Sequence, residues 1–127
     1  MNIDGIPTRT LRAHPERGVI DIIDQTRLPH ALHWLRLSTL EEAAHAIRAM
    51  QVRGAPLIGV TAAYGLALAL DFEASDRRLA EAAELLRATR PTAVNLHWAL
   101  ARMENVLRPL PAAQRCAAAW AEAAAIA

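Results

Sequence analysis

Residues 56–70 read PLIGVTAAYGLALAL, and only Thr61 and Tyr64 interrupt this run of apolar and small side chains. A helix that is apolar nearly all round is either buried at the centre of a protein or spans a membrane. Spanning takes about 20 apolar residues, whereas this run is shorter and Asp71 follows it. We therefore predict that residues 56–70 form a buried central helix.

A second helix is expected just before this one, over about residues 40–50. Apolar side chains recur there at helical spacing. Two capping boxes are open for its start, Ser38 with Glu41 or Thr39 with Glu42. In either one, a hydroxyl and a carboxylate satisfy N–H groups that the first helical turn leaves free.

Three more helices are expected downstream. Ser75 can cap one that ends before Pro91, and Thr92 can start another that ends at Pro109. The last covers residues 112–127, is rich in alanine and stops without a glycine or proline cap. We therefore expect a bundle of about five helices and interpret the chain as the leading piece of a longer protein.

The N-terminal third has a different pattern. Residues 9–13 can extend, residues 14–18 hold turn formers, residues 19–24 are rich in β-branched side chains, and residues 31–37 supply a third extended segment. Short β-rich segments separated by turn formers favour strand–turn–strand pairing. A small antiparallel sheet is therefore expected at the N-terminus.

Together these patterns predict the α+β class. We place a small antiparallel β segment at residues 1–37 and a helical domain at residues 38–127. Among the 127 residues, 54% are hydrophobic and 21% are charged, which excludes a disordered chain. Because 29 of the residues are alanine and only five are aromatic, the apolar content favours helices more than a bulky core.

Charge and cysteine content narrow the class of protein. The net charge is +1, and all 14 basic residues are arginine. A general nucleic-acid or membrane-surface binder needs a basic excess on one face, so neither is expected. Cys116 is the only cysteine, which excludes an intramolecular disulfide, and no secretory signal is visible at the N-terminus. We expect a cytoplasmic protein.

Two predicted helix starts share a physical logic. Arg53-Gly54-Ala55-Pro56 and Arg90-Pro91-Thr92 each place an arginine and a turn immediately before a helix. Free backbone N–H groups and the positive end of the helix dipole favour an anion there, and a guanidinium offers paired donors to phosphate oxygens. The pattern also fits ordinary turns whose arginines are solvated surface charges.

Other candidates for chemistry are weaker. His30 and His33 are three residues apart in a predicted strand or loop, where that spacing puts them on opposite faces, and no third ligand is evident, so no metal site is expected. Cys116 lies beside an alanine run, and the sequence shows no general base that could activate its thiol, so we interpret it as structural. No catalytic residue is assigned to this segment.

Three motifs in order resemble the methylthioribose-1-phosphate isomerase family. They are DQTRLP at residues 24–29, AMQVRGAPLIGVTAAYG at residues 49–65 and TRPTAVNL at residues 89–96. The resemblance covers essentially the whole chain. It implies that the chain corresponds to the N-terminal portion of the family, whose C-terminal Rossmann-like α/β domain is absent here.

The resemblance implies an aldose–ketose isomerase of methionine salvage, which converts 5-methylthioribose 1-phosphate to 5-methylthioribulose 1-phosphate without metal or organic cofactor. It implies substrate binding by Arg53, Gly54, Ala55 and Arg90, the residues that the helix starts also single out. The family's cysteine and aspartate that act as acid and base lie in the downstream domain, so this segment alone is expected to be inactive. Family members are commonly homodimers.

Three alternatives stay open. Within the same superfamily the chain could belong to a ribose-1,5-bisphosphate isomerase. It could also belong to a non-catalytic regulatory subunit of the exchange factor for translation initiation. The third alternative is a helical interaction module without a ligand, whose apolar surface pairs with another copy or with its own missing domain.

Overall fold

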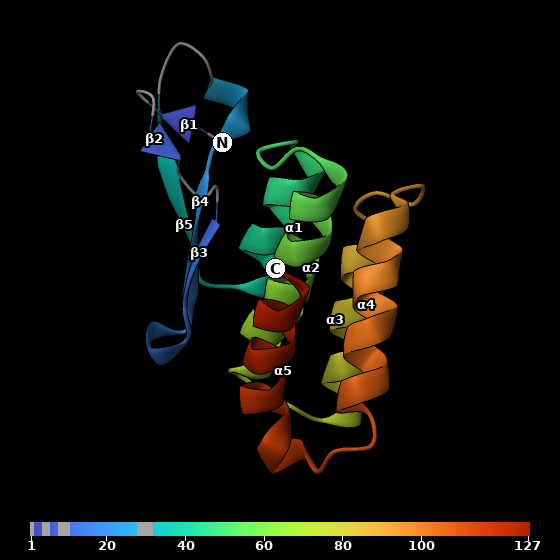
Figure 1. Cartoon of the computed structure of the whole chain (residues 1–127). Helices are drawn as coiled ribbons and strands as arrows, with labels where there is room; N and C mark the ends of the chain where they lie inside the picture. Colours follow the sequence, from blue (N-terminus) through green and yellow to red (C-terminus); the bar gives the residue numbers. More distant parts are fainter. Residues whose placement is uncertain (1, 4–5, 8–10, 28–31) are drawn as a thin grey trace.

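The computed structural model of the chain describes residues 2–3, 6–7, 11–27 and 32–127. A small sheet lies along one side of a group of five helices (Figure 1). Residues 9, 10 and 31 of the predicted strands, and His30 of the histidine pair, lie outside the described residues. The expected α+β class is confirmed.

The larger sheet has the strand order β3-β4-β5, and both pairings are antiparallel. Its strands are β3 (Leu11–His14), β4 (Val19–Ile23) and β5 (Trp34–Leu37). The turn between β3 and β4 is a short 3-10 helix, η1 (Pro15–Arg17), which Gly18 closes at φ 65°. Because left-handed backbone carries no steric penalty for glycine, this residue suits the turn. The three expected strands are thus confirmed.

The sequence pattern missed one strand pair. A two-residue strand β1 (Asn2–Ile3) pairs antiparallel with β2 (Ile6–Pro7). Segments this short show no alternation of polar and apolar residues, which is the signal that predicts a strand. A second 3-10 helix, η2 (Gln25–Arg27), follows β4.

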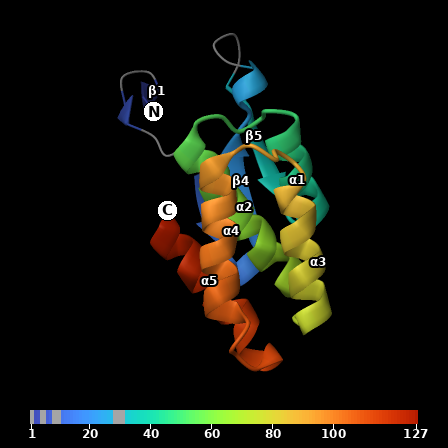
Figure 2. The ribbon, with the colours of Figure 1, turned by 90° about the vertical axis from the view of Figure 1, so that its right-hand side faces the viewer.

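The helix α2 (Ala55–Leu70) is the centre of the molecule. It contacts the four other helices and is buried from Ile58 to Leu70; Figure 2 shows α4 and α3 in front of it. The remaining helices are α1 (Leu40–Arg48), α3 (Asp76–Arg87), α4 (Val94–Leu107) and α5 (Ala112–Ile126). The predicted buried central helix is confirmed. Among the described residues, no helix combines the length and the apolar character needed to cross a bilayer.

The structure selects one capping box and moves one helix start. Thr39 caps α1, because its hydroxyl accepts from the Glu42 N–H, while the Glu42 carboxylate accepts from the N–H groups of Ser38 and Thr39. The expectation that Thr92 starts α4 is wrong by two residues. The Ala93 N–H donates to the Arg90 carbonyl, closing a turn with Pro91 in its second position, and α4 begins at Val94.

Helix α2 packs closely on α4 because Gly59 has no side chain. A Cβ at Gly59 would lie 3.0 Å from the carbonyl oxygen of Asn95, in the first turn of α4. The two helices run in the same direction and begin at the same end of the molecule (Figure 1). The beginnings of α2 and α4 are therefore held side by side.

Candidate functional site

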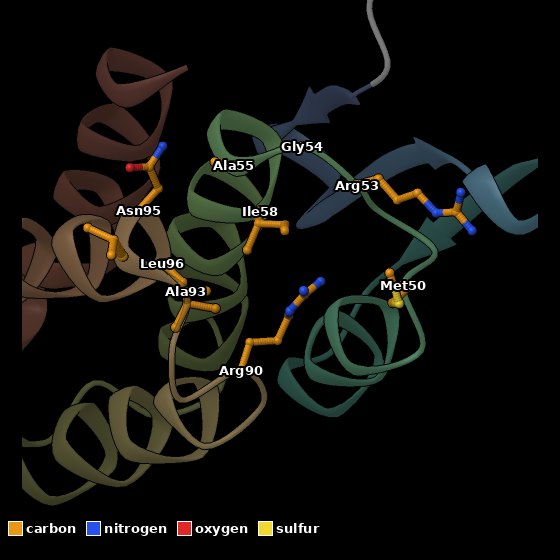
Figure 3. Close-up of a pocket in the computed structure, with 10 residues that line it drawn as sticks. Met50, Arg53, Gly54, Ala55, Ile58, Arg90, Ala93, Asn95 and Leu96 are labelled. Carbon is orange, nitrogen blue, oxygen red and sulfur yellow. The ribbon is translucent and has the colours of Figure 1, made fainter.

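A hollow of about 340 Å³ lies where α2 and α4 begin and α1 ends (Figure 3). All four residues predicted to bind substrate line it, namely Arg53, Gly54, Ala55 and Arg90. The structure thus brings together two segments that are 37 residues apart in the sequence. The remaining lining residues are Met50, Ile58, Ala93, Val94, Asn95 and Leu96.

The α2 side of the hollow offers free backbone donors. Gly54 is the N-cap of α2, with φ 89° and ψ 129°, a conformation that favours glycine. Glycine has no side chain to cap the helix, and Pro56 has no N–H. The N–H groups of Gly54, Ala55 and Leu57 lie in the first turn, where no carbonyl of the same helix can accept a hydrogen bond from them. They are free to bind water or a ligand.

The α4 side repeats this arrangement. The buried Thr89 hydroxyl donates to the Leu86 carbonyl at 2.6 Å and anchors the chain just before Arg90. The N-cap of α4 is Ala93, whose methyl group cannot accept a hydrogen bond. The N–H groups of residues 94–96 are therefore also left to water or a ligand. Two uncapped helix beginnings, each with its positive dipole end, face the same hollow.

The two arginines of the hollow are available for an anion. Arg53 is exposed and Arg90 is half-buried, and neither forms an ion pair with any carboxylate of the described residues. By contrast, Arg115 and Arg87 bind Asp76 and Glu104. In Figure 3 the Arg90 side chain reaches into the hollow, whereas the Arg53 guanidinium extends away from it. Joint binding of one anion therefore requires Arg53 to change rotamer, which breaks no ion pair.

Sequence reasoning missed Met50 at this site. Its backbone has φ 60°, and it is the one non-glycine residue with a positive φ in the described part of the chain. The Met50 N–H donates to the Ile47 carbonyl and the Gln51 N–H to the Ala46 carbonyl, so α1 ends in a Schellman motif. Glycine or asparagine would have signalled this left-handed position, but methionine does not.

The remaining candidates form no second site. Within residues 11–27 and 32–127, no three His, Cys, Asp or Glu side chains gather in a way that could hold a metal ion. The Cys116 Sγ lies 2.6 Å from Oδ1 of Asp71. Burial, together with that carboxylate, raises the pKa of the Cys116 thiol to about 11. A thiol of this kind stays protonated near neutral pH and is a poor nucleophile.

The geometry of the hollow suits the binding of an anion. Uncapped helix N-termini bind anions through backbone N–H groups, and a guanidinium offers paired donors. The described residues of the hollow include no histidine, cysteine or carboxylate that could transfer a proton. The hollow can therefore hold an anion, while proton transfer would need groups from outside it.

Comparisons with known proteins show which proteins the chain is similar to. The model of the Initiation factor 2 subunit family matches residues 51–124. A methylthioribose-1-phosphate isomerase of Dechloromonas aromatica is 87% identical over 127 residues, which is all of this chain and 35% of that protein. The crystal structure of 5-methylthioribose 1-phosphate isomerase from Pyrococcus horikoshii is 36% identical, with a TM-score of 0.85 over 94% of this chain and 35% of that one.

A second solved structure is also similar. It is the translation initiation factor eIF-2B, subunit delta, from A. fulgidus, which is 36% identical, with a TM-score of 0.77 over 84% of this chain and 34% of that one. The chain spans about a third of the length of the isomerases that it matches.

Proposed function

Since the chain belongs to the Initiation factor 2 subunit family, we propose that it supplies the phosphate-binding part of a methylthioribose-1-phosphate isomerase. The observation that carries this proposal is the shared hollow, in which Arg53 and Arg90 lie beside two uncapped helix beginnings. The 87% identity to a methylthioribose-1-phosphate isomerase supports the choice of substrate.

The proposed reaction explains why a binding part is needed. Phosphate on the anomeric oxygen blocks the spontaneous ring opening of a free sugar, so an acid must assist cleavage of the ring C–O bond. A hydrogen must then move from C2 to C1. We assign Arg53, Arg90 and the N–H groups of α2 and α4 to holding the phosphate during both steps. The acid and the base would come from outside the hollow, so the chain alone would be inactive.

The finer properties of the complete protein are also part of the proposal. We place it in the cytoplasm, in agreement with its single cysteine, and we propose that it is a homodimer. An apolar groove of about 390 Å³ between the beginnings of α2 and α4 and the end of α5, lined by Pro56, Trp98 and Ile126 among others, supports an association surface.

The test uses a hybrid protein in which this chain replaces the matching segment of the Dechloromonas aromatica isomerase. Arg53→Ala and Arg90→Ala are each expected to lower kcat/KM for 5-methylthioribose 1-phosphate at least tenfold, about 1.4 kcal/mol of transition-state binding. Arg17→Ala is the matched control, since Arg17 is exposed, lies in η1 away from the hollow and pairs with no described carboxylate. A loss below tenfold in both site variants would contradict the proposed roles.

A second candidate is a non-catalytic subunit, which the likeness to the eIF-2B delta subunit favours. The same hybrid separates the two functions. Turnover that depends on Arg53 and Arg90 supports the isomerase. Binding of the sugar phosphate without turnover, in a hybrid whose remaining segment is active in its own parent protein, supports the subunit.

A further inference from the structure

We propose that Asp24 positions Arg53 at the hollow, acting through the turn of η2 and the backbone of Gln51. This inference rests on the proposed function, because it adds a positioning residue to the phosphate-binding part. It also gives a role to the first of the three motifs, DQTRLP at residues 24–29, whose described residues 24–27 do not line the hollow.

Asp24 is a buried carboxylate at the end of β4. It is 3% exposed. Its Oδ1 accepts from the Thr26 N–H at 3.0 Å and from the Thr26 hydroxyl at 2.5 Å, and its Oδ2 lies 3.4 Å from the Arg27 Nε. Burial disfavours the charge, but the hydrogen bonds from Thr26 and the charge of Arg27 hold the pKa of the Asp24 carboxyl below its ordinary value of 3.8. Asp24 is therefore ionised near neutral pH, and the turn around it satisfies its charge.

This carboxylate fixes the backbone at the start of η2. An aspartate that accepts the N–H two residues further on forms an Asx turn, which sets the backbone of the residue between them, here Gln25. The Asp24 N–H donates to the His33 carbonyl at 2.8 Å, just before β5. The direction of the Gln25 N–H is therefore set by the sheet and by the Asp24 side chain.

The Gln25 N–H carries this position to the segment that ends at the hollow. It donates to the Gln51 carbonyl at 2.8 Å, while the Gln51 N–H donates to the Ala46 carbonyl at 2.9 Å. Residue 51 is thus held between η2 and the end of α1, and Val52 after it is fully buried. Arg53 follows directly, so its backbone starts from a place that η2 helps to define.

A shift of this segment would be felt at the phosphate. Arg53 must turn into the hollow to reach an anion, and the position of its backbone decides how far its guanidinium extends. A contact with phosphate is present in the ground state and in the transition state, so weakening it raises KM and leaves kcat. A loss of folded protein does the opposite, because fewer active molecules lower the apparent kcat and leave KM unchanged. The two effects of a variant are therefore separable.

The experiment uses the hybrid protein with 5-methylthioribose 1-phosphate. Asp24→Ala is expected to raise KM about tenfold with less than about a threefold change in kcat, the size of effect that a small misplacement of a binding group produces. Asp24→Asn keeps an acceptor for the Thr26 N–H and is expected to raise KM less than about threefold. Asp21→Ala is the matched control, because Asp21 also lies on β4 but binds Arg36 and His14 of the neighbouring strands. It is expected to leave KM unchanged.

Combined variants show whether Asp24 acts through Arg53. Asp24→Ala is expected to add less than about threefold to the KM of Arg53→Ala, but its full effect of about tenfold to the KM of Arg90→Ala, because residues that act as one unit do not combine independently. A KM rise that multiplies fully with that of Arg53→Ala would overturn the inference. So would a loss of kcat in Asp24→Ala with no change in KM.

A second measurement keeps the inference apart from the proposed function. A wild-type hybrid without turnover would overturn the proposed function, and the inference is then decided by inorganic phosphate. Phosphate that binds the folded protein raises its Tm, and this rise is expected to be smaller in Asp24→Ala than in the wild-type hybrid and in Asp21→Ala. Equal rises in all three proteins would overturn the inference, and no rise in any of them would overturn both.

Discussion

Replacing Arg115 by alanine should remove a set of hydrogen bonds that joins α5 to the end of α4 and to the beginning of α3. The Arg115 side chain is 4% exposed and lies in the first turns of α5. Its Nε donates to the Leu107 carbonyl at 3.0 Å, its Nη2 to the Arg108 carbonyl at 3.0 Å and its Nη1 to the Ala74 carbonyl at 2.9 Å. One guanidinium thus satisfies the end of α4 and the segment before α3. Nη2 also lies 2.5 Å from Oδ1 of Asp76.

The size of the effect follows from these contacts. A hydrogen bond from a charged donor contributes about 1.5–3 kcal/mol, but three that share one side chain do not add fully, and water can enter the space that alanine leaves. Asp76 is 89% exposed, so its ion pair contributes at most about 1 kcal/mol. We expect Arg115→Ala to lower the free energy of unfolding by about 3 kcal/mol. That is a large share of the roughly 5–15 kcal/mol typical of a domain.

This loss can be measured by urea unfolding monitored by circular dichroism, from the midpoint and the slope of the unfolding curve. Arg77→Ala is the matched control, because Arg77 binds Glu81 at 2.8 Å on the surface of α3 with its side chain 85% exposed. An exposed ion pair of this kind contributes little to the free energy of unfolding, because water screens both charges. If Arg115→Ala and Arg77→Ala differ by less than about 1 kcal/mol, the burial argument for Arg115 is refuted.

Two further predictions concern the beginnings of helices. Gly54→Ala is expected to cost about 1–3 kcal/mol in urea unfolding through backbone strain alone, since an added Cβ would meet no described atom within 4 Å; an unchanged midpoint would contradict the strain at φ 89°. Hydrogen bonds, first from the Ser38 N–H, hold the pKa of the Glu42 carboxyl below its ordinary value of 4.5. Its stabilising effect is therefore present above pH 4.5 and is lost as the pH falls further. Glu42→Gln should accordingly lower the free energy of unfolding by about 0.3–1 kcal/mol at pH 7 and by less at pH 3. A difference between the two proteins that does not change with pH would exclude a role for the charge.

Local signals in the sequence were sufficient to predict most of the helices and strands. The apolar run of residues 56–70 predicts a buried helix because a helix without a polar face has nowhere else to lie. Gly54 and Pro91 mark turns through their own backbone preferences, so both helix beginnings of the hollow could be located before any contact was known. The first residue of α4 could not, because whether the helix begins at Thr92 or at Val94 depends on a turn that the Arg90 carbonyl closes.

The sequence by itself thus determined the five helices, the three strands of the larger sheet and the position of two arginines at helix beginnings, because those features depend on neighbours within a few positions. Tertiary structure alone decided the rest. The contact of Gly59 with Asn95 brings the two helix beginnings to one hollow. Arg115 is buried, so its hydrogen bonds stabilise the packing of three helices. Hydrogen bonds to α1 and η2 hold the loop that carries Met50. Each of these depends on groups far apart in the sequence, whose meeting no local pattern encodes.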